Sequence, residues 1–172
     1  MIYPQNIEHK IDFQVIRDSL KGCCTSSLGR ERVEQMQWLT DYPTIQSLLQ
    51  HLREMMLLLT DPTLSFPHGE IYDLREALSR IRIEGLFMDE AELFSLSKML
   101  DYAAQLERFF VTLDKAKYPI LSSSLIASSP NSLIASIDRI LDRYGKMRDN
   151  ASPELARIRK EISASQGSVS RA

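Results

Sequence analysis

Basic side chains near the C-terminus are the residues in this sequence best suited to binding chemistry. Residues 138–172 hold eight Lys and Arg against five Asp and Glu, whereas the whole chain holds 21 against 23. Guanidinium and ammonium groups contact the phosphates of nucleic acids, so this segment is a candidate nucleic-acid interface. The candidate contacts in it are Lys146, Arg148, Arg157, Arg159 and Lys160.

Acidic residues interleave with these basic ones and allow a second interpretation. Side chains three or four residues apart meet on a helix face, so the cations could be paired within a solvated helix. Because the positive excess is small, we expect nucleic-acid binding by this chain to be weak and sensitive to salt. The interleaved acidic residues are Asp142, Asp149, Glu154 and Glu161.

No residue pattern for catalysis, metal binding or nucleotide binding occurs in the sequence. The glycines stand singly, so no glycine-rich loop is available to hold a phosphate. His9, His51 and His68 are far apart, and none is spaced for a shared metal site. We therefore expect no catalytic residue, no metal ligand and no cofactor in this chain, and neither binding nor hydrolysis of ATP.

Cys23 and Cys24 are the two cysteines of the chain, and they are neighbours. Neighbouring cysteines rarely form a relaxed disulfide, which favours a reducing, cytoplasmic setting. They could be reactive thiols, but small buried hydrophobic side chains are the interpretation we favour. The N-terminus lacks the pattern of a signal peptide, and the longest apolar run, Met55–Leu59, is too short to span a bilayer.

Three further features have both a functional and a structural interpretation. Trp38 could stack on a base, although such a tryptophan more often fills the junction between two helices. Met55–Leu59 could be an adaptable binding stripe, but packing in the core is the simpler interpretation. The acidic group Asp89–Glu92 fits a helix cap with first-turn charges better than a catalytic cluster.

Apolar residues recur at intervals of three and four along the chain, which predicts an all-α bundle of about seven helices. The longest, about 89–114, has a wide apolar stripe and is expected at the centre of the bundle. A short helix followed by a loop is expected in the serine-rich stretch 122–129. The other predicted helices run from Asp12 to about Gly22, from Ser26 or Ser27 to Met36, from Asp41 to Asp61, from about Asp73 to Arg82, from Pro130 to Tyr144, and from Ser152 onward.

Two signals define the C-terminal part of the fold. Ser152-Pro153-Glu154 is a strong helix-start pattern with the serine as N-cap. Gly145 follows the expected helix end at Tyr144, and we predict that it has a positive φ. The turn should return the final helix to the preceding one and bury Leu155 and Ile158.

The helix pattern suggests two parts of unequal size. Residues 1–150 are predicted to form the helical bundle, and residues 151–172 to begin a longer helix. Because no stop signal precedes Ala172, we expect this lever-like helix to continue beyond it.

The segment Gly145–Arg159 resembles the signature of the second bacterial MutS family, the paralogues of the mismatch-repair MutS ATPases. That family shows a Gly-x-[Ile/Val]-x-Asp-x-Ala-Ser-x-x-Leu segment just before a long helix. Met147 takes the branched aliphatic position, and Tyr144 stands where many members have an acidic residue. The matching residues are Gly145, Asp149, Ala151, Ser152 and Leu155.

The resemblance extends over essentially the whole chain. Ile11–Ile16 and Ser26–Arg32 resemble the family's first two helices, and Arg82–Leu86 before Asp89 also fits. It implies the N-terminal core and lever region of a large homodimeric ATPase, with a clamp, the ATPase and usually an Smr nuclease domain downstream. ATP and Mg would be cofactors of the full-length protein, and no ATP-site or nuclease residue falls within this chain.

Two functions fit this sequence. The resemblance implies a non-catalytic mechanical module that relays the state of the ATPase to a nucleic-acid clamp, because packed helices can transmit a shift between distant sites. The implied roles of the family are suppression of recombination through branched DNA, related to DNA repair, and rescue of collided ribosomes. The alternative is a freestanding helical protein-interaction or adaptor domain.

Overall fold

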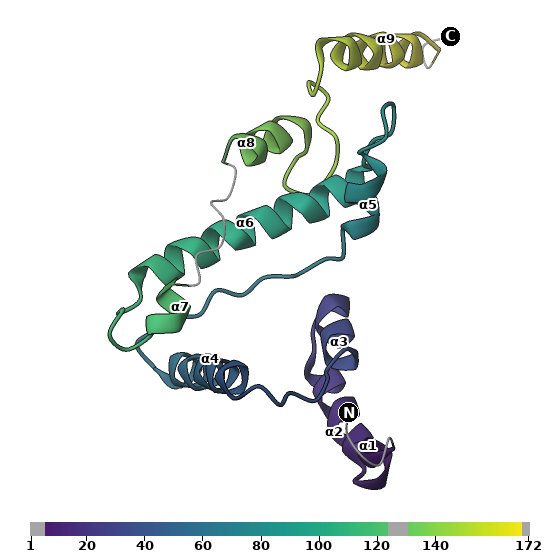
Figure 1. The fold of residues 1–172 in the computed structure, drawn as a ribbon. Helices are drawn as coiled ribbons and strands as arrows, with labels where there is room; N and C mark the ends of the chain where they lie inside the picture. The colour runs from purple at the N-terminus through teal and green to yellow at the C-terminus, as the bar shows by residue number, and fades with distance from the viewer. Residues whose placement is uncertain (1–5, 124–130, 170–172) are drawn as a thin grey trace. The chain divides into compact units, whose positions relative to one another are not determined.

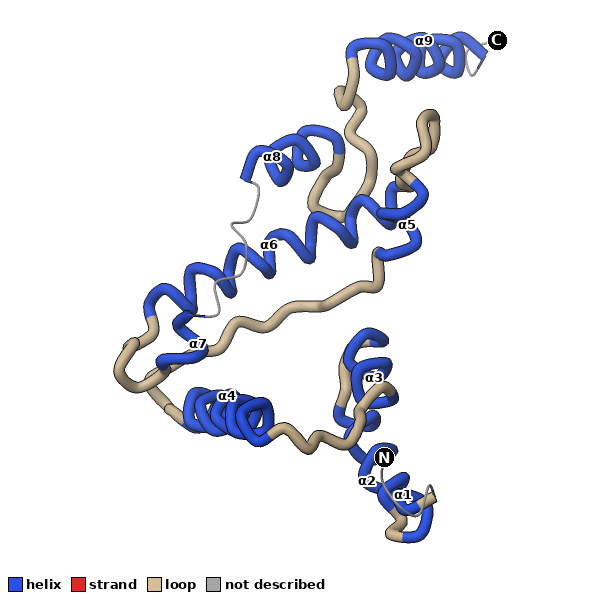
Figure 2. The backbone as a smooth tube through the Cα atoms, viewed as in Figure 1, coloured by secondary structure: helices blue, strands red, loops and turns tan. Residues whose placement is uncertain are grey.

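A computed structural model describes residues 6–123 and 131–169 of the chain, with side chains described up to Gln166 (Figure 1). The described residues are all-α, as predicted, and hold nine helices rather than about seven. Figure 2 shows helices joined by loops and no strand in the described residues. The helices are α1 (Ile7–Lys10), α2 (Phe13–Cys23), α3 (Ser27–Glu34), α4 (Tyr42–Thr60), α5 (Arg75–Arg80), α6 (Glu90–Thr112), α7 (Pro119–Ser123), α8 (Asn131–Ile140) and α9 (Pro153–Val169).

Side-chain caps explain where several helices begin. The Ser26 hydroxyl accepts the N–H of Gly29 at 3.0 Å at the start of α3. At the start of α6, Asp89 accepts the N–H of Glu92 at 2.8 Å, and the Glu92 carboxylate accepts the N–H of Asp89 at 3.0 Å. This reciprocal pair satisfies two N–H groups that the helix leaves unpaired. The acidic group is therefore a cap, as the sequence indicated.

One predicted helix boundary is confirmed and another was wrong. Helix α2 begins after Asp12 as predicted, although Asp12 is left-handed with φ 53° and its side chain makes no capping hydrogen bond. Helix α8 ends at Ile140 and not at Tyr144, because Leu141 leaves the helix to form an antiparallel bridge with Met147.

The described residues form two compact units, and the boundary between them falls inside α6. Among the described residues, 6–73 and 105–123 make the first unit, and 74–104 and 131–169 make the second. On α6 the buried residues are the small Ser97 and Ala104, whereas its large apolar side chains are half-buried or exposed. The wide apolar stripe that the sequence predicted for this helix is therefore only partly buried.

The core of the first unit joins α4, α7 and the end of α6. Leu58, Leu113, Tyr118 and Leu121 are buried together, and the Phe66 ring meets Phe109 edge-on at 5.5 Å. Leu64 and Phe66 belong to the loop after α4, so this loop is held by apolar packing.

A buried carboxylate links α4 to α7 in this core. Glu54 is only 1% exposed, and its Oε2 accepts the N–H groups of Ile120 and Leu121, each at 3.0 Å. Gln50 donates to Oε1 at 3.2 Å. Glu54 thus caps α7 from another helix, which compensates the cost of burying its polar oxygens.

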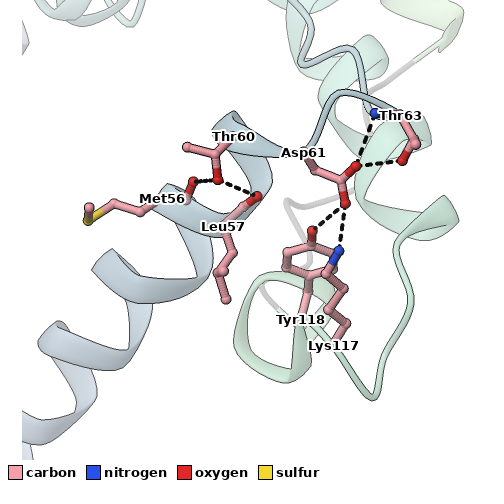
Figure 3. A network of polar contacts seen from close by, with 7 residues as sticks. All are labelled: Met56, Leu57, Thr60, Asp61, Thr63, Lys117 and Tyr118. Carbon is pink, nitrogen blue, oxygen red and sulfur yellow. Dashed lines mark hydrogen bonds and ion pairs between the residues drawn. The ribbon is translucent and has the colours of Figure 1, made fainter.

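A second carboxylate, Asp61, ends α4 and ties it to the segment before α7 (Figure 3). Its Oδ2 lies 2.6 Å from the Lys117 ammonium, and its Oδ1 accepts the hydroxyl of Thr63 at 2.6 Å and the N–H of Thr63 at 3.0 Å. The hydrogen bond from Lys117, followed by those from Thr63, lowers the pKa of Asp61 below its usual range. The same contact raises the pKa of Lys117.

This ion pair predicts a pH dependence of stability. Because the pKa of Asp61 is lower in the folded chain, its contribution is full above about pH 4, the ordinary carboxyl value, and is lost as the pH falls through the lowered value. Asp61→Asn should therefore reduce the free energy of unfolding at about pH 6, and the difference from wild type should shrink in acid. Urea unfolding at several pH values measures this difference. An effect of equal size at about pH 6 and about pH 2.5 would contradict the assignment.

A buried arginine organises the N-terminal helices. The Arg17 guanidinium donates to both oxygens of Glu8 at 2.9 and 3.0 Å and to the backbone oxygens of Met36 at 2.8 Å and Val33 at 3.0 Å. It also lies over the Phe13 ring, 5.3 Å from its centre. One side chain of α2 thereby fixes α1 and the end of α3.

Candidate nucleic-acid interface

The basic candidates lie on α9 and on the turn that leads to it from α8. A bridge between Leu141 and Met147 closes this turn, in which Asp142 donates its N–H to the Lys146 oxygen at 2.8 Å. Gly145 has φ 78°, as predicted. A Cβ at this position would lie 2.7 Å from the Phe94 ring, so the turn also needs glycine for space.

Asp142 stabilises the same turn, a role that the sequence did not reveal. Its Oδ1 accepts the N–H of Tyr144 at 2.8 Å and the N–H of Lys146 at 2.9 Å. The backbone hydrogen bonds from Lys146 and Tyr144 lower the pKa of Asp142. An aspartate three residues before a glycine is a recognisable turn signal, so this contact could have been proposed from the sequence.

Arg148 has a structural role that its exposed position conceals. Its Nε donates to the backbone oxygens of Leu141 at 2.7 Å and Asp138 at 2.9 Å. These oxygens lie at the end of α8, where helix carbonyls lack partners within the helix. Arg148 therefore closes α8 and is oriented by the fold.

The arginines of α9 are paired with nearby carboxylates. Arg157 donates to Glu154 at 2.7 Å and to Glu161 at 2.8 Å, and these hydrogen bonds raise its pKa. Arg159 forms an ion pair with Asp149. The interpretation of a helix face with paired charges is the one that fits these two cations best. Such exposed pairs contribute little to stability.

Lys146 and Lys160 are exposed. Lys160 borders an open hollow of about 540 Å³. The residues lining this hollow are Asp149, Asn150, Ala156, Arg159, Lys160, Ser163 and Ala164. A groove with one carboxylate and two cations gives a weak positive field, which fits the small positive excess of this segment.

Ser152 caps α9 as predicted. Its hydroxyl accepts the N–H of Leu155 at 3.1 Å, and the helix begins at Pro153. Leu155 and Ala151 are half-buried, but Ile158 is 40% exposed, so the expected burial of Ile158 was wrong. Helical spacing shows which residues share a face, and it does not show whether another element covers that face.

Ser152→Ala should destabilise the start of α9, because a lost serine cap costs about 1 kcal/mol. Far-ultraviolet circular dichroism during urea unfolding reports this loss. Ser152→Asp is the matched control and should keep the cap, since aspartate accepts the same N–H. An unfolding midpoint of Ser152→Ala equal to that of wild type would contradict the cap.

The other sequence candidates lie elsewhere. Cys23 is exposed and Cys24 is half-buried, so the expectation of two buried thiols was wrong for Cys23. Trp38 lies on the loop after α3 and is 49% exposed, with its ring 6.4 Å from that of Phe13, and it does not fill a closed helix junction. Of Met55–Leu59, Leu58 is buried and Met56, Leu57 and Leu59 are exposed, so core packing holds for part of the run.

Among the described residues, no three His, Cys, Asp or Glu side chains gather as a metal site requires. In the same part of the chain, no helix has the length and apolar character needed to cross a membrane.

Comparison with known proteins decides the relationship of this chain. It is 30% identical over 161 residues to "Endonuclease MutS2" of Ruminiclostridium cellulolyticum, a match that covers 92% of this chain and 20% of that protein. It is also 30% identical over 166 residues to the protein of the same name from Pelotomaculum thermopropionicum, covering 93% of this chain and 20% of that protein. This chain is related to the MutS2 proteins. No family model matches it.

A further MutS2 protein supports this relationship, and the matches show how much of each relative the chain covers. The MutS2 protein of Alkaliphilus oremlandii is 28% identical over 163 residues, again 92% of this chain and 20% of that protein. The chain thus spans about a fifth of the length of the curated relatives it matches. The resemblance to the second MutS family is confirmed at this level.

Proposed function

We propose that this chain is a non-catalytic helical relay module of a MutS2-type protein, which couples the state of an ATPase to a clamp on nucleic acid. The relationship to MutS2 proteins supports the family assignment. The observation that carries the relay function is α6, a helix of 23 residues whose first part belongs to one compact unit and whose last part belongs to the other.

The sequence of α6 suits a rigid connection. Glu90–Thr112 contains neither glycine nor proline, the residues that most weaken a helix. A helix of this length extends roughly 34 Å. The Asp89 and Glu92 cap further stabilises the start of α6.

The full-length protein supplies the other parts of the proposed function. By its resemblance to the second MutS family, it is a cytoplasmic homodimeric ATPase that uses ATP and Mg, with nuclease activity in a further domain. The partner that the clamp grips is either branched DNA, in the control of recombination and repair, or a collided ribosome. The candidate contacts Lys146 and Lys160 would assist the clamp and would not hold nucleic acid alone.

The 172-residue chain by itself should therefore bind nucleic acid weakly. Three of its five candidate cations are already held by carboxylates or backbone oxygens, so few can contact phosphates. Fluorescence anisotropy with a labelled branched DNA should give a dissociation constant well above micromolar at about 0.15 M salt, weakening further with added salt. Nanomolar binding under these conditions would contradict the relay function and favour an independent nucleic-acid-binding domain.

A further inference from the structure

Trp38, which the relay function leaves without a role, borders a half-open hollow beside the N-terminal helices, here called the Trp38 hollow. It has a volume of about 200 Å³ and mostly apolar walls. A concave apolar surface with a few polar groups is the usual form of a ligand site. Its apolar residues are Phe13, Met36, Trp38 and Leu39. Its polar residues are Glu8, Arg17 and Gln37.

The backbone that carries Trp38 is held in place by the buried Arg17. This arginine is only 8% exposed, and it donates to the backbone oxygen of Met36 at 2.8 Å, two residues before Trp38. The Trp38 ring in turn lies 6.4 Å from the Phe13 ring, tilted by 34°. The indole is nevertheless 49% exposed. Much of its ring surface is therefore open to a ligand at a position that the fold fixes.

The polar part of the Trp38 hollow has little net charge and can still accept hydrogen bonds. Arg17 donates to the two Glu8 oxygens at 2.9 and 3.0 Å, so the two charges compensate each other. A phosphate or an ammonium ion would gain little attraction from such a pair, which favours an uncharged ligand. Each Glu8 oxygen accepts one of these bonds, and because a carboxylate has about four lone-pair sites, both oxygens can accept a further donor.

We propose that the Trp38 hollow binds one unpaired nucleobase that carries an exocyclic amino group, such as cytosine, with its ring stacked on Trp38 and its amino group donating to Glu8. Proteins hold the bases of single-stranded nucleic acid by stacking them on aromatic side chains. The amino group of cytosine is a donor, whereas uracil and thymine have at that position an acceptor oxygen, which the Glu8 carboxylate repels.

The Glu8 carboxylate also favours a base over an apolar side chain of another protein. An aliphatic side chain would cover the same apolar walls, but it would displace water from Glu8 and offer no donor in return, which costs free energy. A base offers a flat face to Trp38 and a donor at its edge to Glu8, so it matches both parts of the hollow.

This inference takes nucleic acid as the ligand from the proposed function and adds a contact in the first unit, whereas α9 belongs to the second. One stacked base contributes modestly, so the 172-residue chain should bind a short single strand with a dissociation constant of about 1 mM. Such binding agrees with the weak affinity expected above. Because the test needs neither ATP nor the clamp, its failure would leave the proposed coupling between them standing.

The indole N–H of Trp38 tests the proposal directly. The chain contains one tryptophan, so this group gives a single signal in a proton–nitrogen correlation spectrum. We expect a short single strand of deoxycytidine to shift the signal saturably, and a deoxyuridine strand of equal length to bind at least about tenfold more weakly. Equal length gives equal numbers of phosphates, which removes backbone contacts as the cause. Equal binding of the two strands, or no shift with either, would overturn the proposal.

Substitutions locate the binding in the Trp38 hollow. Trp38→Ala should weaken binding of the deoxycytidine strand at least about fivefold, whereas Trp38→Phe keeps a stacking ring and most of the affinity. The backbone N–H signals of Gln37 and Leu39 report binding in these variants. Phe87→Ala is the matched control and should bind as wild type does, because Phe87 is 77% exposed but lies in the loop before α6, outside the hollow. Circular dichroism confirms that each variant keeps its helix content.

Two results with these probes would contradict the proposed ligand. One is a Trp38→Ala chain that binds the deoxycytidine strand as tightly as Phe87→Ala does. The other is a saturable shift of the Trp38 signal by N-acetyl-leucine amide with none by the deoxycytidine strand, which would assign the hollow to an apolar side chain of a protein partner.

Discussion

Glu54→Ala is expected to lower the free energy of unfolding by about 3 kcal/mol, because it leaves two buried N–H groups without an acceptor. Those groups belong to Ile120 and Leu121 at the start of α7, and Glu54 reaches both from α4 at 3.0 Å. The buried side chain also leaves a cavity. Urea unfolding followed by circular dichroism measures the change.

The matched variants separate the hydrogen bonds from the packing. Glu54→Gln keeps the shape and one acceptor oxygen, so its loss should be clearly smaller than that of Glu54→Ala. Glu84→Ala, at an exposed loop position, should change the free energy of unfolding by less than about 0.5 kcal/mol. If Glu54→Ala were as mild as Glu84→Ala, the proposed link between α4 and α7 would be wrong.

Gly145→Ala is expected to cost about 2–3 kcal/mol in the second unit. The positive φ of 78° alone costs a residue with a side chain roughly 1–2 kcal/mol. The added methyl group would also lie 2.7 Å from the Phe94 ring, which has to move from its place on α6. The free energy of unfolding measured in urea reports the sum of both effects.

Two further variants resolve these contributions. Gly22→Ala lies within α2, where a Cβ meets no atom within 4 Å, and it should stabilise the chain by about 0.5–1 kcal/mol. Adding Phe94→Leu to Gly145→Ala should remove the part of the loss that is due to crowding and leave the part due to φ. A Gly145→Ala chain as stable as wild type would contradict the geometry of this turn.

Local features of the fold could be predicted from the sequence. The caps at Ser26, Asp89 and Ser152 and the positive φ of Gly145 depend on residues within a few positions of one another. The most specific part of the MutS family resemblance is likewise a short segment, 145–155, in which the turn and the cap occur together. Spacing is sufficient for contacts of this kind.

Contacts between distant segments could not be predicted in the same way. Glu54 and Ile120 are separated by 66 residues, and nothing in either segment indicates the other as its partner. The same holds for Arg17, whose partners in α1 and after α3 appear only once these helices pack. The candidate nucleic-acid residues show a related limit, because Arg148 is an acceptable phosphate contact in sequence and a helix-closing side chain in the structure.

The relay function predicts that a less stable α6 helix uncouples ATP hydrolysis from nucleic-acid binding. Each of these two activities should be retained. Gln105 is exposed and lies in α6 beside the unit boundary. Glycine at this position should weaken the helix by about 1 kcal/mol relative to alanine, so Gln105→Gly and Gln105→Ala form a matched pair. Neither substitution adds a charge or fills space.

The decisive measurement is the affinity of the full-length protein for branched DNA in the presence of ATP and of ADP, compared between Gln105→Gly and Gln105→Ala. The account predicts that Gln105→Ala keeps the wild-type ratio of the two affinities. It predicts that in Gln105→Gly the ratio falls toward one, while ATP hydrolysis without DNA stays unchanged. A Gln105→Gly protein with the full wild-type ratio would contradict the relay function of this chain.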